Sequence, residues 1–155
     1  MIILMGLFLT CLEGVLRLDP SRFPGREIFV LNVTSNEIQP DWCPDGHFLR
    51  VPIDDTPRHQ IYPFLDQTSR FIREHLDAGH IVVVHCHAGI SRSASIVIAY
   101  LLYARICTTF LEANQFVKER RRRICPNFGF CGELERYSNE LAAARALAPQ
   151  DLLTQ

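Results

Sequence analysis

The chain has 155 residues, of which 48% are hydrophobic, and its formal net charge is −1 at pH 7. A chain of this length forms one domain that can bury about 68–70% of its unfolded surface. Such a charge gives no general attraction to nucleic acid or to a membrane, so neither is expected as a partner. The six cysteines show no short paired spacing, which favours a reducing compartment, cytoplasmic or nuclear, over a disulfide framework.

The first nine residues are almost all apolar, which raises the question of a signal sequence or a membrane span. They have no basic flank and are too few to cross a bilayer, so membrane insertion is not expected. We predict instead two strands, at 2–4 and 7–10, joined at Gly6. A further apolar strand is predicted at 28–32.

A strand–helix–strand unit follows in the middle of the chain. The predicted strand at 47–53 leads directly into Asp54 and Asp55, and an amphipathic helix is predicted over 60–77, before a strand at 80–85. A parallel crossover of this kind brings the ends of both strands to the same edge of a sheet. We therefore expect the two aspartates to share a rim with the residues that follow the 80–85 strand.

Those residues form the most informative segment of the chain. Ile81 to Val84 read as a central strand and Ser93 to Tyr103 as a packed helix, which makes residues 86–92 the turn between them. In that geometry the backbone N–H groups of the turn and the positive end of the helix point at one spot, which suits an anion.

The side chains of this turn suit the same purpose. A cysteine at a helix N-terminus beside a cation is largely ionised at neutral pH, so Cys86 is predicted to be a thiolate. Arg92 offers a planar fork that can hold two oxygens of a phosphate group. Gly89 allows positive φ or a close approach of the backbone to a ligand. Ser93 can donate a hydrogen bond to the thiolate when it acts as a leaving group.

Three further helices are predicted, at 92–105, 110–123 and 130–145. Thr109 and Glu112 have the spacing of a capping box at the start of the second of these. The basic run 118–123 is interpreted as the solvated end of that helix, in preference to a nuclear signal or a patch for an anionic ligand. Residues from 146 onward are predicted to form a frayed tail.

Several motifs together resemble one known family. The run from His85 to Ser95 is similar to the signature of the dual-specificity branch of the cysteine-dependent protein phosphatases. Further matches are Leu31 to Thr34 and Ile124 to Phe130, and the likeness covers about residues 2–142. The resemblance implies an α/β fold in which a central, mostly parallel twisted sheet is flanked by helices on both faces. It implies a catalytic domain at 1–145 and a tail at 146–155.

The resemblance also implies a role for each site residue. Cys86 is the nucleophile, Asp55 the general acid, Arg92 the phosphate clamp and Ser93 the donor to the leaving thiolate. With Arg92, the loop residues that hold the phosphate are His87, Ala88, Gly89, Ile90 and Ser91. His85 is expected to orient this loop, and the side chain of Asn127 to brace it. Without the resemblance, Asn127 is equally well interpreted as an ordinary residue at the entry to the last helix. The reaction is hydrolysis of phosphotyrosine, phosphoserine and phosphothreonine in a protein substrate, with no metal or other cofactor.

Other interpretations of these residues remain open. Cys86 could be an ordinary buried apolar side chain, and Asp54 and Asp55 could both be surface turn residues. A metal site at His80, His85, Cys86 and His87 is disfavoured because ligands that alternate along a strand diverge and Arg92 repels a cation.

Three other functions fit the same loop. An RNA 5′-phosphatase or a phosphoinositide phosphatase is favoured by lysines in the loop, and residues 87–91 contain none. A non-catalytic phosphopeptide-binding adaptor is expected to lack the nucleophile or the acid. The physiological substrate, the preferred phosphorylated residue, the oligomeric state and any second cysteine that resolves oxidised Cys86 are left open by the sequence.

Overall fold

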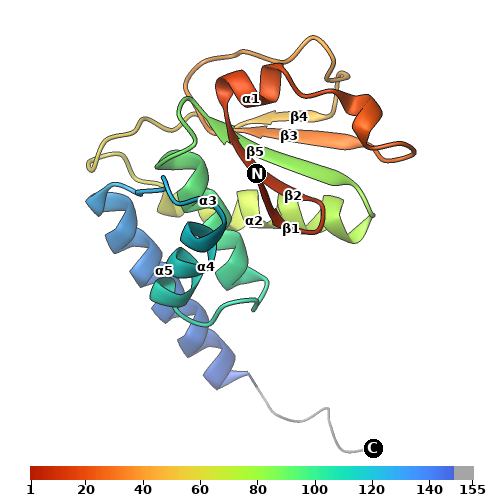
Figure 1. The fold of residues 1–155 in the computed structure, drawn as a ribbon. Helices are drawn as coiled ribbons and strands as arrows, with labels where there is room; N and C mark the ends of the chain where they lie inside the picture. The colour runs from red at the N-terminus through yellow and green to blue at the C-terminus, as the bar shows by residue number, and fades with distance from the viewer. Residues whose placement is uncertain (149–155) are drawn as a thin grey trace, which may run out of the picture.

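The structure, a computed structural model, describes residues 1–148 and is built on one five-stranded sheet (Figure 1). The strands lie in the order β1-β2-β5-β3-β4, and only β1 is antiparallel to its neighbour. Their bounds are β1 Ile2–Leu4, β2 Leu7–Cys11, β3 Ile28–Asn32, β4 Phe48–Arg50 and β5 Ile81–Cys86. The predicted α/β fold with a mostly parallel sheet is confirmed.

Both faces of the sheet are covered, but unequally. The larger core lies under four helices, which are α2 Tyr62–Asp77, α3 Arg92–Tyr103, α4 Phe110–Arg120 and α5 Phe128–Leu147. The smaller core on the other face lies under the short helix α1 Leu12–Leu16, the 3-10 turn η1 Pro20–Arg22 and part of the segment 33–47. Helix α1 was not predicted, because five residues with Gly14 at their centre are too few to show a helical period.

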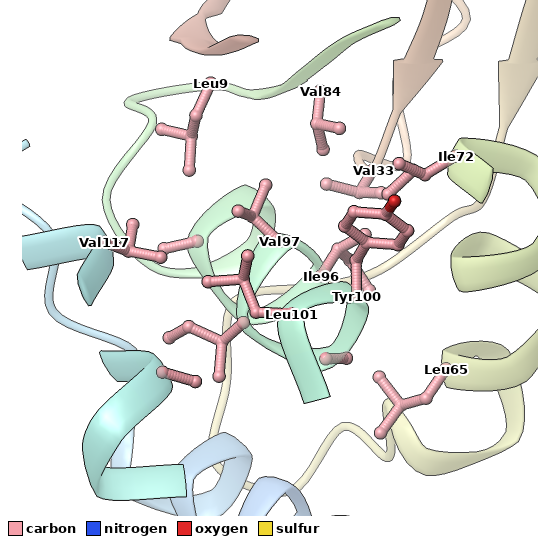
Figure 2. Packing of buried hydrophobic residues seen from close by; sticks show 14 of the residues in the cluster. Leu9, Val33, Leu65, Ile72, Val84, Ile96, Val97, Tyr100, Leu101 and Val117 are labelled. Carbon is pink, nitrogen blue, oxygen red and sulfur yellow. The ribbon is translucent and has the colours of Figure 1, made fainter. Parts of the chain in front are cut away.

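The central strand β5 and the helix that follows it form the most buried part of the molecule. All six residues of β5 are buried, and ten of the twelve residues of α3 are buried as well. Figure 2 shows Ile96, Val97 and Leu101 of α3 below Leu9 and Val84 of the sheet, in the middle of the larger core. This packing fixes the direction in which the chain leaves β5 and enters α3, so the turn between them has rigid supports on both sides.

Several element boundaries differ from those predicted. The strand expected at 47–53 pairs only over Phe48–Arg50, because its neighbour β3 ends at Asn32. Helix α4 ends at Arg120 instead of residue 123, and α5 begins at Phe128 instead of residue 130, with Asn127 as its N-cap. The helix also continues to Leu147, so the tail expected from residue 146 falls mostly on 149–155, outside the described residues.

Two further expectations concern the start of the chain and its cysteines. The predicted turn at Gly6 is present, with φ +86°, between β1 and β2. All six cysteines are free thiols. Within residues 1–148 no helix is both long enough and apolar enough to cross a bilayer.

Candidate active site

The turn between β5 and α3 contains residues 87–91, which we call the anion loop. Each of its five carbonyl oxygens accepts a hydrogen bond from outside the loop. Leu12 N–H donates to the His87 carbonyl at 3.1 Å and Cys125 N–H to the Ile90 carbonyl at 2.8 Å. Ser95 N–H donates to the Ser91 carbonyl at 2.9 Å. In a trans, planar peptide bond the N–H group points away from the C=O group. Because the five carbonyls point out of the loop, the N–H groups of residues 88–92 face its interior.

The remaining two carbonyls are held by a residue that the sequence analysis did not single out. Arg121 donates from Nε to the Gly89 carbonyl at 2.8 Å and from Nη2 to the Ala88 carbonyl at 3.4 Å. The basic run was interpreted as a solvated helix end, and this is wrong for Arg121, which lies half-buried just after α4. A sequence pattern does not distinguish one buried arginine within a row of four, because the periodicity of α4 ends immediately before it.

Gly89 is required at its position by space as well as by backbone conformation. Its φ is +65°, and a Cβ there would lie 2.7 Å from the Thr10 carbonyl oxygen and 2.7 Å from Nη2 of Arg121. Any larger residue would separate the anion loop from β2 and from the arginine that holds it.

Cys86 lies at the bottom of the loop with its side chain pointing into it. The residue is 2% exposed, its Sγ lies 3.1 Å from Ser93 Oγ, and it accepts a hydrogen bond from Gly89 N–H at 3.2 Å. Burial opposes ionisation of this thiol, but the hydrogen bonds from Ser93, Gly89 and Ile90 outweigh it and hold the pKa below its ordinary value. The site therefore stabilises a thiolate.

Arg92 joins the anion loop to the segment that carries the two aspartates. Its Nη1 donates to the Ile53 carbonyl at 3.0 Å. Its Nε is buried and has no hydrogen-bond partner among residues 1–148. An unsatisfied buried donor is costly, and a phosphate oxygen in the loop would satisfy this one.

His85 precedes the nucleophile and is completely buried. Its Nδ1 lies 3.3 Å from the Cys86 carbonyl oxygen, which assigns the proton to Nδ1. Burial lowers the pKa of the imidazole to about 4, so the ring is neutral at physiological pH. His85 Nδ1 thus contacts the carbonyl of Cys86, the residue just before the anion loop. His85 Nε2 has no hydrogen-bond partner among the described residues.

The aspartate loop, residues 54–60, occupies the rim beyond β4. Asp55 is exposed and accepts a hydrogen bond from Asn127 Nδ2 at 3.0 Å. Asp54 points toward a different partner, since its Oδ2 lies 3.9 Å from Nδ1 of His59. The two neighbouring carboxylates thus have different surroundings, and only Asp55 is tied to the start of α5.

Asn127 does not brace the anion loop with its side chain, which corrects the expectation from the sequence. Its side-chain oxygen accepts from Phe130 N–H at 3.0 Å as the N-cap of α5, and its side-chain nitrogen holds Asp55. The brace is made by the main chain, because Asn127 N–H donates to Ser91 Oγ at 3.0 Å. The N-cap position uses the amide oxygen, which leaves the amide nitrogen to face the aspartate loop.

The aspartate loop is held against α5 by two more contacts. A Cβ on Gly129 would lie 2.1 Å from the Pro57 carbonyl oxygen, so only glycine permits this approach. Glu133 of α5 accepts from the N–H groups of Ile61 and Tyr62 at 3.0 and 3.1 Å, which caps the start of α2. These contacts were not predicted, because they join segments about seventy residues apart.

Comparison with known proteins gives one consistent family. The family model described as the dual specificity phosphatase catalytic domain matches residues 28–140. Human dual specificity protein phosphatase 16 is 42% identical over 139 residues, which are 90% of this chain and 21% of that protein. Mouse dual specificity protein phosphatase 1 is 37% identical over 124 residues, which are 77% of this chain and 32% of that protein. The chain thus spans only a fifth to a third of the length of these relatives.

Solved structures show the same likeness. Human DUSP28 superposes with a TM-score of 0.83 and 29% identity, covering 92% of this chain and 97% of that chain. The human tyrosine phosphatase-like serine/threonine/tyrosine-interacting protein has a TM-score of 0.78 and 32% identity, covering 91% of this chain and 96% of that chain.

The first prediction concerns the ionisation of Cys86. We expect Ser93→Ala to raise the pKa of this thiol, because it removes a hydrogen bond that stabilises the thiolate. A hydrogen bond to a charged group contributes about 1.5–3 kcal/mol, which corresponds to about one to two pKa units, so alkylation by iodoacetamide at mildly acidic pH should slow about 10- to 100-fold. Cys43 and Cys107 are internal references, since burial raises the pKa of each to about 11. If the pH dependence of Cys86 alkylation is the same in Ser93→Ala as in the wild-type chain, Ser93 does not stabilise the thiolate.

The second prediction concerns the contact between α5 and the aspartate loop. Gly129→Ala forces a methyl group against the Pro57 carbonyl, and we expect it to lower the free energy of unfolding by about 1–3 kcal/mol. Gly132→Ala is the matched control in the same helix, because a Cβ there meets nothing within 4 Å. It should be neutral or stabilise by up to about 1 kcal/mol. Urea denaturation measures both, and equal effects of the two variants would refute the contact.

Proposed function

The chain belongs to the dual specificity phosphatase family, and from this premise we propose that it hydrolyses phosphotyrosine, phosphoserine and phosphothreonine in protein substrates. The single observation that carries the proposal is the combination at the anion loop. A cysteine with a lowered pKa lies at the bottom of a ring of inward N–H groups, beside a buried Arg92 Nε without a partner.

The first step is the attack of the Cys86 thiolate on phosphorus. The inward N–H groups of the anion loop and the Arg92 guanidinium stabilise the negative charge of the phosphoryl oxygens as the bond to the leaving oxygen breaks. The planar guanidinium can contact two of these oxygens at once. The product of this step is a cysteinyl-phosphate and a leaving hydroxyl group that needs a proton.

Asp55 is our candidate for the donor of that proton. It lies on the rim of the site, on the loop that Arg92 joins to the anion loop through the Ile53 carbonyl. In the second step a water molecule attacks the cysteinyl-phosphate, and the same carboxylate accepts its proton. The Ser93 hydroxyl donates to the sulfur and stabilises the thiolate as it leaves.

A non-catalytic phosphopeptide-binding role is the main alternative function. It would use the same anion loop, but it requires neither a low pKa of Cys86 nor a general acid. The lowered pKa of Cys86 and the hydrogen bond between Asp55 and Asn127 support the enzyme over the adaptor. An RNA 5′-phosphatase or phosphoinositide phosphatase remains a rival enzyme. Turnover of phosphotyrosine and phosphothreonine peptides, measured against a 5′-triphosphate RNA and a phosphoinositide, tests the proposal. Preferential turnover of the RNA or the lipid would overturn it.

The third prediction separates catalysis from binding. Cys86→Ser should abolish hydrolysis while the folded protein still binds vanadate or sulfate, because only the nucleophile is lost. Arg92→Lys should lower kcat/KM by about 10²–10³ although the charge is kept, since lysine cannot hold two oxygens in one plane. Steady-state kinetics and anion binding measure these effects. More than trace activity in Cys86→Ser rules out the covalent intermediate.

The fourth prediction identifies the acid. Asp55→Asn should slow hydrolysis of phosphotyrosine peptides by about 10²–10⁴, and much less for aryl phosphates whose phenols are acidic and hardly need the proton. It should also remove the alkaline limb of the pH profile for poor leaving groups. Asp54→Asn is the matched control and should have only a modest effect. If the two variants show the reverse pattern, the acid is Asp54, and if both are mild the acid lies outside this loop.

A further inference from the structure

A cavity of about 520 Å³ opens beside the anion loop, on the side away from the aspartate loop. In the sheet, β2 and the β3–β4 pair lie on opposite sides of β5. Helix α1 follows β2 and the aspartate loop follows β4, so the two lie on either side of the anion loop (Figure 1). The cavity lies between α1, His87 and Ala88 of the anion loop, and Arg123.

This position places the cavity within reach of a bound substrate. A phosphorylated side chain in the anion loop has the aspartate loop on one side and the cavity on the other. An extended peptide advances about 3.3 Å per residue, so a residue next to the phosphorylated one can reach His87 and Ala88 if the peptide runs toward α1. Neither the exposed side chain of His87 nor the side chains of α1 take part in the hydrogen bonds that hold the anion loop.

Much of the cavity wall is apolar. Leu12, Leu16 and Ala88 line it, and Leu16 is 43% exposed although it is a large apolar residue. Covering such a side chain removes apolar surface from water, which favours binding of another apolar group.

The rim of the cavity carries one positive charge without a partner. Arg17 is paired with Glu13 at 2.8 Å, so these two charges offset each other. Arg123 is exposed and lines the cavity. Among residues 1–148 it has neither an ion-pair nor a hydrogen-bond partner. An acidic group of the substrate would meet Arg123 at this rim.

We propose that the cavity is a substrate subsite that selects peptides with a large apolar residue next to the phosphorylated residue and an acidic residue beyond it. The inference rests on the proposed function, since it assigns the occupant as part of a phosphorylated protein substrate. Continuity of the cavity with the anion loop, its largely apolar wall and the uncompensated Arg123 at its rim are the three observations that carry it.

The experiment uses phosphotyrosine peptides of one sequence that differ at a single position. The first pair carries leucine or alanine next to the phosphotyrosine, and it is made once for the N-terminal side and once for the C-terminal side. The second pair carries glutamate or glutamine one residue further from the phosphotyrosine. For the wild-type chain we expect kcat/KM to be about tenfold higher with leucine than with alanine on one of the two sides. We expect it to be about two- to fivefold higher with glutamate than with glutamine.

Matched variants assign each preference to its side chain. Leu16→Ser should bring the leucine-to-alanine ratio close to one, whereas Leu111→Ser, at a leucine of α4 that is 75% exposed, should leave it unchanged. Arg123→Ala should abolish the preference for glutamate, and Arg122→Ala, at the neighbouring exposed arginine outside the cavity, should not.

The outcomes separate this inference from the proposed function. Turnover of all peptides with equal kcat/KM, or ratios that Leu16→Ser and Arg123→Ala leave unchanged, overturns the subsite and leaves the phosphatase in place. If no peptide is turned over, the proposed function fails. Binding of the same peptides to the Cys86→Ser variant by calorimetry then tests the cavity without catalysis. Equal affinities for the leucine and alanine peptides would overturn it there too.

Discussion

The outward hydrogen bonds of the anion loop are the constraint on which the site depends. A free five-residue turn would not hold its carbonyl groups on one side, because nothing within it satisfies them. Here the donors come from the start of α1, from Arg121 after α4, from Cys125 before α5 and from α3 itself. Four separate parts of the fold thus satisfy the outward carbonyls, which allows the N–H groups to point inward. The buried helix α3 holds one end of the loop in place.

The nucleophile and the candidate acid have separate attachments. Cys86 belongs to the central strand β5 and is fixed by the larger core. Asp55 lies on an exposed loop that depends on the first two turns of α5, through Asn127, Gly129 and Glu133. The bond from Arg92 to the Ile53 carbonyl is a direct link between the two parts. The start of α5 also contacts the anion loop, because Asn127 N–H donates to Ser91 Oγ, so the position of α5 affects both the carboxylate and the loop.

The sequence predicted the parts of the molecule that are written in contiguous residues. The strands, the longer helices and the placement of Cys86 and Arg92 on one turn follow from periodicity and from a single motif. The role of Arg121 did not follow, because a buried and a solvated arginine look alike within a basic run. Nor did the partner of the Asn127 side chain, which depends on how α5 docks against the aspartate loop. The choice of Asp55 over Asp54 came from family resemblance, and it stays a prediction that the hydrogen bond to Asn127 supports.

The completely buried His85 also makes the stability of this domain depend on pH, because its imidazole is held neutral in the folded chain. Its pKa is about 4 in the folded chain, against an ordinary value of about 6.5. Above pH 6.5 both states are neutral, and the imidazole favours neither. As the pH falls from 6.5 to 4, the His85 imidazole takes up a proton in the unfolded chain but stays neutral in the folded chain. This difference lowers the free energy of unfolding by about 3 kcal/mol. Acidification therefore lowers the free energy of unfolding of the domain through a residue of the same strand that carries its nucleophile.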